Sequence, residues 1–383
     1  MGVIEMNIPK LGFGTMRLPV LGNDTIDMPQ FIKMVDCYMA NGMSYFDTAY
    51  KYHNGEAEKA IKTAVVERYP RDSFKIATKL PIWWCDAPSD MARIFNEQLE
   101  RCGVEYFDMY LIHAMSVNTD NKLIDFGGYE FLNEMKAQGK IKCLGFSFHG
   151  DAHNLEKVLT ERPEMEFVQL QINYYNWRYY QWAENAEILY RIARKYNKPV
   201  IVMEPVWGGA LANLPQRLDK MITDTFSGGR HTTPAAMALR FCGSLDGVVM
   251  ILSGMSDLRQ LEENVKLFKD FKPLATEERD LLFQVADELD KYYKIGCTEC
   301  NYCECPAGIS IAKIFKIYNA FLLNENVNEF KKAYEELEKC ANLCTACAKC
   351  EAVCPQGIKI IEKLTYISKT YEELDYDTGI ENE

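Results

Sequence analysis

The chain has 383 residues, of which 48% are hydrophobic and 26% charged, and its formal net charge is -12. This length and composition are typical of a globular protein with room for two domains. The negative charge argues against nucleic acid or an anionic membrane as a partner, since both would repel it. No apolar run approaches the ~20 residues of a membrane span, and the N-terminus has neither the basic start nor the apolar core of a signal peptide. We therefore expect a cytoplasmic protein that binds neither nucleic acid nor membrane.

Short apolar runs alternate with amphipathic stretches from Leu11 to about Phe271. The runs predict eight β-strands, at Leu11–Met16, Met43–Asp47, Lys75–Lys79, Met109–His113, Cys143–Ser147, Phe167–Ile172, Val200–Met203 and Gly247–Ser253. The stretches between them predict helices, among them Phe31–Asn41, Ser89–Cys102, Asn154–Thr160, Ala183–Tyr196 and Pro234–Cys242. Short, continuously apolar strands at intervals of about 30 residues favour an α/β fold with a closed (βα)8 barrel. An open doubly wound sheet is the alternative, but the first strand–helix turn, GFGTM, lacks the G-x-G-x-x-G of a dinucleotide-binding sheet.

Polar side chains end three successive predicted strands. Asp47 ends the second strand, Lys79 the third and His113 the fourth, and Tyr52 follows Asp47 by five residues. Active sites of parallel barrels are built where the strands end. A lysine ammonium beside a phenol lowers the phenol's pKa from its usual value of about 10, and a carboxylate holds the lysine charged. A histidine nearby can donate a hydrogen bond to a carbonyl group. Together the four residues predict a site that protonates a carbonyl oxygen while a hydride arrives at the carbon.

The character of the sequence changes past Pro273. Helical patterns cover Thr276–Tyr292, Ile311–Leu322 and Val327–Lys339, and we find no strand pattern there. We expect two domains, a barrel over residues 1–272 and a small all-α domain over residues 273–383. The acidic tail Tyr371–Glu383 is expected to be a solvated, frayed end.

Nine of the 14 cysteines lie between Cys297 and Cys354, and the other five are scattered, as inert core thiols are. Such clustering in a cytosolic chain indicates metal ligation rather than disulfides. The second group, CTACAKCEAVCP, has the C-x2-C-x2-C-x3-C-P spacing of bacterial 4Fe-4S ferredoxins. The first group, CTECNYCECP, again places three cysteines in tight series before a fourth. A zinc site would need only four ligands, so the two groups favour two 4Fe-4S clusters.

In two-cluster ferredoxins the cysteine before proline serves the other cluster. The sequence therefore predicts one cluster on Cys297, Cys300, Cys303 and Cys354, and the other on Cys344, Cys347, Cys350 and Cys305. The spacing supports this arrangement, because Cys303 and Cys305 start about 6.5 Å apart in an extended chain. Reaching two corners of one small cube from there would strain the turn. Cys340 is left over and is expected to be a free thiol on the last turn of its helix.

The four polar residues resemble the catalytic tetrad of the aldo-keto reductase family, which is Asp, Tyr, Lys and His in this order. Asp47 and Tyr52 match the family's D-[TS]-A-x-x-Y spacing, and Lys79 and His113 match its T-K and L-I-H strand ends. Tyr50 is a rival phenol, but the five-residue spacing selects Tyr52. The resemblance covers about residues 8–270. It implies a TIM barrel that reduces an aldehyde or ketone with NAD(P)H, with Tyr52 as the general acid.

The resemblance also implies which residues bind the cofactor, NADP(H) or NAD(H), along the rim of the barrel. They are Gly14, Thr15, Ser147, Gln171, Ser253, Gly254, Met255, Gln260, Glu263 and Asn264. Ser147 and Gln171 match the residues that hold the nicotinamide carboxamide, and Glu263 and Asn264 match those that face the adenine.

Several positions in this stretch depart from the family. Phe148 replaces the usual Asn beside Ser147, and Met203 stands where many members stack a Tyr on the nicotinamide. Gln260 replaces the Arg that binds the 2′-phosphate of NADPH, with Arg259 one position away. We therefore expect little selectivity between NADPH and NADH.

A barrel followed by two cysteine groups resembles the branch of the family with a C-terminal helical ferredoxin-like domain. GFSFHG (Gly145–Gly150) and MEPVWGG (Met203–Gly209) resemble that branch as well. The branch implies clusters that either carry electrons, with a redox partner protein, or are structural. Two other functions stay open, a ferredoxin-type electron-transfer protein and a redox-sensing subunit that binds nicotinamide. Four tryptophans that follow predicted strand ends either line an apolar substrate pocket or pack loops, namely Trp83, Trp84, Trp177 and Trp207.

Overall fold

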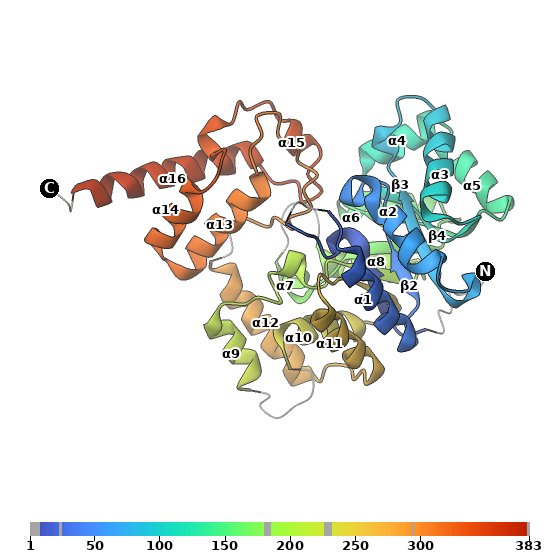
Figure 1. Cartoon of the computed structure of the whole chain (residues 1–383), viewed down its shortest axis with the longest axis horizontal. Helices are drawn as coiled ribbons and strands as arrows, with labels where there is room; N and C mark the ends of the chain where they lie inside the picture. Colours follow the sequence, from blue (N-terminus) through green and yellow to red (C-terminus); the bar gives the residue numbers. More distant parts are fainter. Residues whose placement is uncertain (1–7, 23–24, 180–184, 226–231, 293–294, 381–383) are drawn as a thin grey trace. The chain divides into compact units, whose positions relative to one another are not determined.

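A computed structural model of the protein describes residues 8–22, 25–179, 185–225, 232–292 and 295–380. They belong to two compact units (Figure 1). The first comprises Met1–Trp177, Ala183–Pro205 and Ala236–Ala275, and the second Arg178–Trp182, Val206–Ala235 and Thr276–Glu383. The chain therefore enters the second unit and returns to the first before it leaves the first for good after Ala275, whereas the sequence predicts a single division at residue 272.

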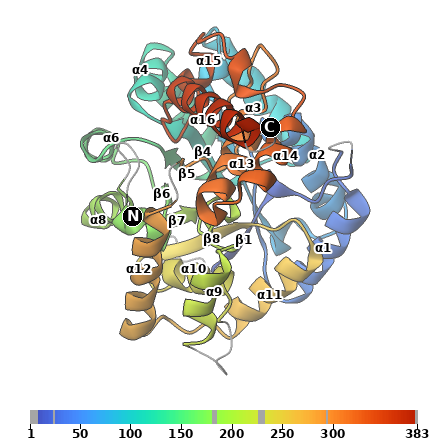
Figure 2. The same ribbon diagram turned by 90° about the vertical axis from the view of Figure 1, so that its left-hand side faces the viewer.

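Eight parallel strands close into a barrel in chain order, with β8 paired to β1 (Figure 2). They are β1 (Leu11–Gly14), β2 (Tyr45–Asp47), β3 (Lys75–Leu80), β4 (Phe107–Met115), β5 (Ile141–Phe148), β6 (Phe167–Gln171), β7 (Val200–Met203) and β8 (Val248–Gly254). Every strand begins and ends within two residues of its predicted range. The predicted eight-stranded α/β barrel is confirmed.

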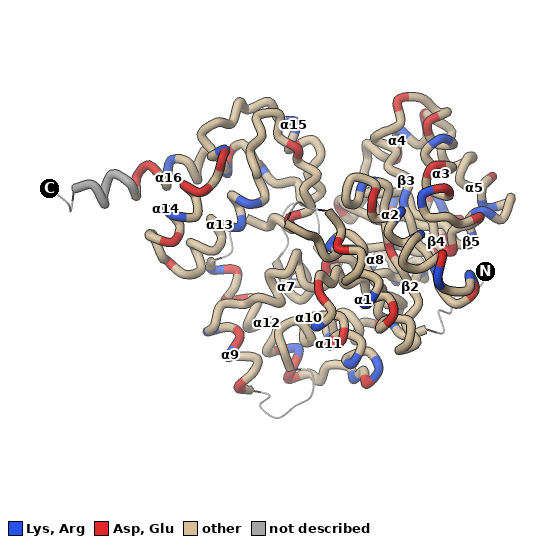
Figure 3. The backbone as a smooth tube through the Cα atoms, in the orientation of Figure 1, with Lys and Arg blue, Asp and Glu red and all other residues tan. Residues whose placement is uncertain are grey.

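Helices connect the strands and surround the barrel. They are α1 (Met28–Ala40), α2 (Glu56–Ile61), α3 (Ser89–Cys102), α4 (Val117–Asp125), α5 (Gly128–Ala137), α6 (Ala152–Glu161), α7 (Tyr174–Arg178), α8 (Ala186–Lys195), α10 (Pro234–Gly243) and α11 (Leu258–Lys269). Asp27, Asp151 and Asn185 accept a backbone N–H at the starts of α1, α6 and α8, which fixes where these helices begin. Residues 183 and 184 of the predicted helix before Tyr196 lie outside the described residues. Acidic and basic residues are interspersed along helices such as α3 and α11, so neither presents a block of one sign (Figure 3).

The interior of the barrel is packed with side chains from successive strands. They are Tyr45, Ala77, Met109, Leu111, Cys143, Phe167, Ile201, Met250 and Leu252. Gly12 of β1 makes room for them, since a Cβ at this position would lie 2.8 Å from the Cδ2 atom of Leu252. A packed interior leaves the rim as the place for a functional site.

In the second unit the described residues form helices and no strand. The helices are α9 (Gln216–Thr223), α12 (Thr276–Asp290), α13 (Ile311–Asn324), α14 (Val327–Glu335), α15 (Lys349–Ala352) and α16 (Ile360–Ile380). Residues of α13, α14 and α16, among them Phe315, Phe330 and Ile367, share one buried core. None of the helices described in either unit is long and apolar enough to cross a membrane.

Two expectations for this unit are wrong. The helix expected to reach Lys339 ends at Glu335, so Cys340 is not on its last turn and instead precedes the short turn η7 (Ala341–Leu343). The tail expected to fray from Tyr371 is helical as far as Ile380, as the end of α16, whose Leu364 and Ile367 are buried in the core, and residues 381–383 lie outside the described residues.

Candidate active site

Lys79 lies at the centre of the four predicted catalytic residues. Its Nζ atom donates to Asp47 Oδ1 at 2.7 Å and to the backbone carbonyl of Thr48 at 2.7 Å. The side chains of Lys79 and Asp47 are only 1% and 4% exposed. Burial raises the pKa of Asp47 and lowers the pKa of Lys79, and the charge of each residue opposes the shift of the other. The two residues therefore form a buried ion pair that holds the ammonium in one place.

Tyr52 begins the turn η2 (Tyr52–Gly55), and its hydroxyl oxygen lies 3.5 Å from Lys79 Nζ. The backbone after it is unusual, because His53 and Asn54 have φ angles of 49° and 57° and Gly55 has 90°. Three successive left-handed residues require support from their surroundings, and such backbone is found at functional sites. The loop that carries Tyr52 is therefore held in a specific conformation.

Tyr50, the rival phenol, is turned to other partners. Its hydroxyl donates to Glu97 Oε2 at 2.5 Å, and the guanidinium of Arg101 lies 4.2 Å from the centre of its ring. The structure thus brings Tyr52 to Lys79 and gives Tyr50 a place against α3.

His113 lies near the end of β4, and its ring centre is 6.2 Å from that of Tyr52. The pairing of β4 with β5 shifts register between Ile112 and Met115, and Ala114 has a φ of 48°. The N–H of Ala114 donates to Ser147 Oγ at 2.8 Å. Irregularities of this kind redirect side chains beside active sites, so the end of β4 is shaped around His113.

His113 is expected to stay neutral between about pH 6 and 8. Burial, helped by Lys79 and His149, holds its pKa well below 6.5. Because an unfolded histidine gains its proton near about pH 6.5, stability linked to His113 should be lost as the pH falls below that value. Nitrogen NMR of the imidazole checks this, with exposed His153 recorded in the same spectra. A midpoint for His113 at about pH 6.5 would contradict the expectation.

The four tryptophans have different surroundings. Trp83 lies beside the tetrad, with its ring centre 5.0 Å from that of the histidine. Trp84 is 40% exposed and meets the ring of Tyr50, while Trp177 packs against rings of α8 and α10. Trp207 is buried and belongs to the second unit. Of the three tryptophans described in the first unit, Trp83 is the one whose ring contacts a member of the tetrad.

Part of the predicted cofactor site gathers where β1 and β8 end. Gly14 pairs with Gly254, and Ser253 Oγ accepts from Asn264 Nδ2 at 3.1 Å. Thr15 Oγ1 donates to the backbone carbonyl of Asp47 at 3.0 Å, which joins this end of the barrel to the tetrad. Met255, the next predicted residue, is buried.

The other predicted residues at the strand ends are Ser147 of β5 and Gln171 of β6, both buried. Gln171 Nε2 donates to Asn176 Oδ1 at 3.0 Å, and Asn173 Nδ2 donates to the same atom at 2.8 Å. Asn173 also donates to the backbone carbonyl of Glu204 at 3.1 Å, after β7. Sequence reasoning missed the two asparagines, although polar residues directly after a buried strand are a usable signal.

The predicted phosphate end lies at the start of α11. Asp257 caps this helix through the N–H of Gln260 at 2.8 Å, and Gln260 Oε1 accepts from the N–H of Ser256 at 2.9 Å. Arg259 pairs with Glu263 at 3.1 Å, and both side chains are exposed. The Asp257 carboxylate therefore occupies the N-terminus of α11, and the guanidinium of Arg259 is paired with the Glu263 carboxylate.

A second buried carboxylate, Glu58 of α2, was also missed from the sequence. It is fully buried and accepts from Thr78 Oγ1 at 2.8 Å and Gln98 Nε2 at 3.0 Å. Its position among Ala57, Ala60 and Ile61, all buried, is the signal that could have found it, since a carboxylate on the buried face of a helix needs partners.

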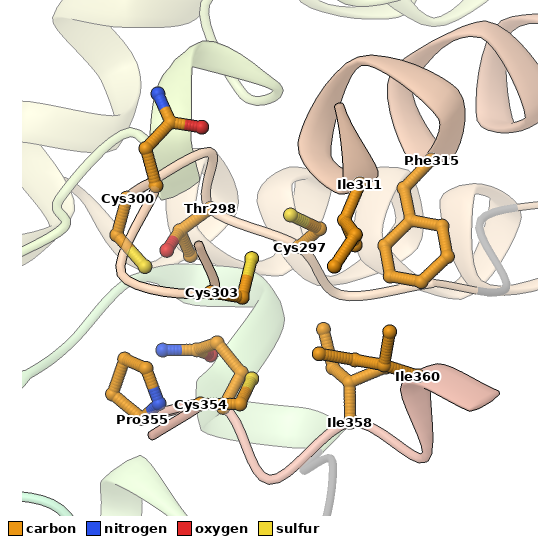
Figure 4. Close-up of a pocket in the computed structure, with 12 residues that line it drawn as sticks. Cys297, Thr298, Cys300, Cys303, Ile311, Phe315, Cys354, Pro355, Ile358 and Ile360 are labelled. Carbon is orange, nitrogen blue, oxygen red and sulfur yellow. The ribbon is translucent and has the colours of Figure 1, made fainter. Parts of the chain in front are cut away.

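Four of the predicted cluster cysteines line one pocket in the second unit (Figure 4). They are Cys297, Cys300 and Cys303, from the loop before α13, and Cys354, from the segment before α16. The space at this pocket that protein atoms do not fill is about 330 Å³ with open solvent included, and isoleucines and Phe315 form its apolar side. Burial, and to a smaller extent the neighbouring thiols, raises the pKa of Cys297 to about 12. These four cysteines are the set that the sequence assigned to one cluster.

The remaining cysteines are less gathered. Cys350 is buried and Cys347 is exposed, while Cys305 and Cys344 pack against the core of the unit. Cys340 Sγ faces the backbone carbonyls of Tyr334 and Leu337, at 3.7 and 3.9 Å. Across the described residues, no group of three or more His, Cys, Asp or Glu side chains is arranged to hold a single metal ion.

Residues 10–287 match the Aldo/keto reductase family. The chain belongs to this family. The predicted enzyme class, an NAD(P)H-dependent oxidoreductase of the aldo/keto reductase family, is thereby confirmed.

The chain is 22% identical over 295 residues to "Uncharacterized oxidoreductase YqkF" of Bacillus subtilis, and this alignment covers 70% of this chain and 89% of that protein. It is 24% identical over 314 residues to a probable voltage-gated potassium channel subunit beta of Arabidopsis thaliana, covering 72% of this chain and 92% of that one.

Solved structures of aldo-keto reductases share the barrel. The enzyme from Klebsiella pneumoniae in complex with NADPH superposes with a TM-score of 0.58 and 20% identity, over 73% of this chain and 91% of that one. This likeness shows a common fold.

Proposed function

We propose that this aldo/keto reductase reduces the carbonyl group of an aldehyde or ketone to an alcohol, with Tyr52 as the general acid. The observation that carries the proposal is the position of Lys79 Nζ, 2.7 Å from Asp47 Oδ1 and 3.5 Å from the hydroxyl of Tyr52. A buried ammonium at this place stabilises the negative charge that develops on the phenolic oxygen as its proton leaves. Asp47 keeps the ammonium charged and aimed. Neutral His113 donates a hydrogen bond that orients the carbonyl oxygen toward Tyr52.

NADP(H) or NAD(H) supplies the hydride when bound. The residues at the rim fit such a cofactor, because Gly14 leaves open the space that a Cβ would fill, 3.4 Å from the Ser253 carbonyl. Ser147 and Gln171 offer a hydroxyl and an amide to the nicotinamide carboxamide. Glu263 and Asn264 would bind the adenine end. The NADPH bound to the Klebsiella pneumoniae relative supports the same cofactor class here.

The direct test is oxidation of NADPH and NADH by purified protein, prepared anaerobically, against a panel of aldehydes and ketones. We expect one alcohol formed for each nicotinamide oxidised. Binding of nicotinamide without turnover of any carbonyl would favour the redox-sensing subunit instead.

Cofactor selectivity should be modest, and the change Gln260→Arg should raise the preference for NADPH by about 10- to 100-fold. A guanidinium can pair with the 2′-phosphate in two hydrogen bonds, whereas the Gln260 amide cannot and already accepts from Ser256. Dissociation constants of both cofactors, measured for the wild type and the variant, check this. Lys266→Arg, which places a guanidinium near the other end of α11, is the matched control. A wild-type preference of about a thousandfold would mean that the phosphate binds elsewhere.

We further propose that the second unit is a ferredoxin-like domain with two 4Fe-4S clusters, one held by Cys297, Cys300, Cys303 and Cys354 and the other by Cys344, Cys347, Cys350 and Cys305. The pocket that the first four thiols line supports this fit. Four thiolates around one space suit a cube whose iron atoms keep the sulfurs apart. Such clusters carry single electrons when present. A redox partner protein would then be needed, since hydride transfer moves two electrons.

A further inference from the structure

Glu58 is a second carboxylate close to the tetrad, and the proposed chemistry does not use it. Figure 1 shows its helix, α2, beside α3. One carboxylate oxygen, Oε1, accepts from Thr78 Oγ1 at 2.8 Å and from Gln98 Nε2 at 3.0 Å. The other oxygen, Oε2, is buried, and Arg101 Nη1 lies 3.6 Å from it. Glu58 therefore has one oxygen directed at β3 and one at the end of α3.

The contact toward β3 reaches the backbone of Lys79. Gln98 Nε2 also lies 3.0 Å from the carbonyl oxygen of Lys79 and 2.9 Å from Thr78 Oγ1, so these atoms and Glu58 share its two N–H groups. Its own oxygen accepts from the hydroxyl of Tyr110 at 2.6 Å. This fully buried network fixes the strand end from which the Lys79 side chain projects.

The contact toward α3 reaches the loop that carries Tyr52. Arg101 Nη1 donates to the backbone carbonyl of Tyr50 at 3.4 Å. It also lies against Gly55, where a Cβ would come within 3.0 Å of the same nitrogen. The guanidinium therefore touches both ends of the segment Tyr50–Gly55, which contains the left-handed residues after Tyr52.

We propose that Glu58 and Arg101 form a positioning pair that holds Tyr52 and Lys79 at the separation needed for proton transfer. The inference rests on the proposed role of Tyr52 as general acid. One carboxylate is joined through Gln98 to the strand that carries Lys79, and through Arg101 to the loop that carries Tyr52. Loss of its charge should loosen the loop, while the ion pair between Lys79 and Asp47 stays in place.

The charge of Glu58 is costly for folding. Burial raises its pKa to about 7, although Thr78, Gln98 and Arg101 favour the ionised form. Lys79, Arg101, Cys102 and Tyr110 are the titratable or charged groups that interact with it. Because the folded pKa exceeds the ordinary value of 4.5, the folded state holds the proton more tightly, and stability linked to Glu58 falls as the pH rises from 4.5 to about 7. A role in stability alone would therefore not favour a carboxylate here.

Glu58→Gln separates positioning from stability. At about pH 8 the variant should unfold at the same temperature as the wild type or higher, because it removes a buried charge. We expect kcat for carbonyl reduction to fall about tenfold, since small misplacements of reacting groups reduce rates strongly, with little change in the KM for NADPH. Amide hydrogen exchange of Tyr52 and Asn54, whose N–H groups bond to the carbonyls of Ala49 and Lys51, should become faster.

Arg101→Met should show the same loss of kcat, and Arg101→Lys, which keeps the charge, should recover part of that kcat.

Asp120→Asn is the matched control. Asp120 is also a buried carboxylate with a hydroxyl and a cation as partners, Tyr129 at 2.5 Å and Lys157 at 3.3 Å, but these belong to α5 and α6. This variant should leave kcat and the exchange of the Tyr52 loop unchanged. A Glu58→Gln enzyme with wild-type kcat and exchange would overturn the proposal, and so would a loss of kcat that merely follows a lower unfolding temperature. If the wild type reduces no carbonyl at all, the proposed function fails, while the exchange measurement still decides whether Glu58 holds the loop.

Discussion

Replacing Tyr52 with Phe is expected to lower the rate of carbonyl reduction by about 10²–10⁴-fold, the usual contribution of a general acid. The change removes one hydroxyl, which lies 3.5 Å from Lys79 Nζ, and leaves the aromatic ring against His113. Nicotinamide affinity should stay nearly unchanged, because the predicted cofactor residues are on other strands. The measurement is single-turnover kinetics with saturating cofactor, where a deuterated nicotinamide shows whether hydride transfer limits the rate.

Tyr50→Phe is the control for this experiment. It removes a hydroxyl two residues away that donates to Glu97 rather than to a member of the tetrad, so its effect should be within a few-fold. A Tyr52→Phe enzyme that keeps more than a tenth of wild-type turnover while chemistry limits the rate would show that the proton comes from another group.

Replacing Cys354 with Ser is expected to destroy or convert the cluster of the first cysteine group and to leave that of the second. Cys354 belongs by sequence to the second group, but it lines the same pocket as Cys297, Cys300 and Cys303. Serine keeps the size of the side chain and is a poor ligand for iron. Iron content should fall from about eight to about four atoms per chain, following the two four-iron cubes of such domains. Low-temperature spin resonance of the anaerobically reconstituted protein should show which signal is lost.

Two further variants make this test specific. Cys305→Ser should perturb the cluster of the second group, because Cys305 is the corresponding cysteine before proline. Cys340→Ser should keep all the iron, since Cys340 Sγ faces backbone carbonyls of its own segment. Loss of a whole cluster in Cys340→Ser, with Cys305→Ser unaffected, would refute cross-ligation.

The barrel and the approach of the tetrad residues could be anticipated from the sequence because both depend on local signals. Each strand is a short apolar run, and in a parallel barrel all strand ends meet at one rim, so Asp47, Lys79 and His113 had to come close. The choice of Tyr52 over Tyr50 came from the spacing of the family it resembles, and in the structure the Tyr52 hydroxyl lies near Lys79 while that of Tyr50 donates to Glu97.

What escaped prediction depends on contacts between distant segments. The apolar neighbours of Glu58 in α2 mark a buried helix face, but its partners on α3 and β3 cannot be read from the sequence. The register shift after Ile112 arises from the pairing of β4 with β5, and the sequence of β4 alone does not indicate it. The grouping of α9 with the C-terminal helices differs from the predicted division for the same reason, since α9 carries an unremarkable amphipathic pattern and its packing on α12, with the ion pair between Arg217 and Glu288, joins segments far apart in the sequence.

That grouping has a consequence for how the protein is made. Gly208 comes so close to Thr298 that a Cβ would lie 2.9 Å from the threonine's carbonyl oxygen, and Arg217 pairs with Glu288. On the ribosome, residues 206–225 emerge well before these partners, and the last barrel strand, β8, is also finished first. Gly208 and Arg217 therefore lack these partners until the C-terminal residues arrive. A gene shortened after Ala275 would leave this segment without those partners permanently, with its apolar side chains open to proteases and to aggregation.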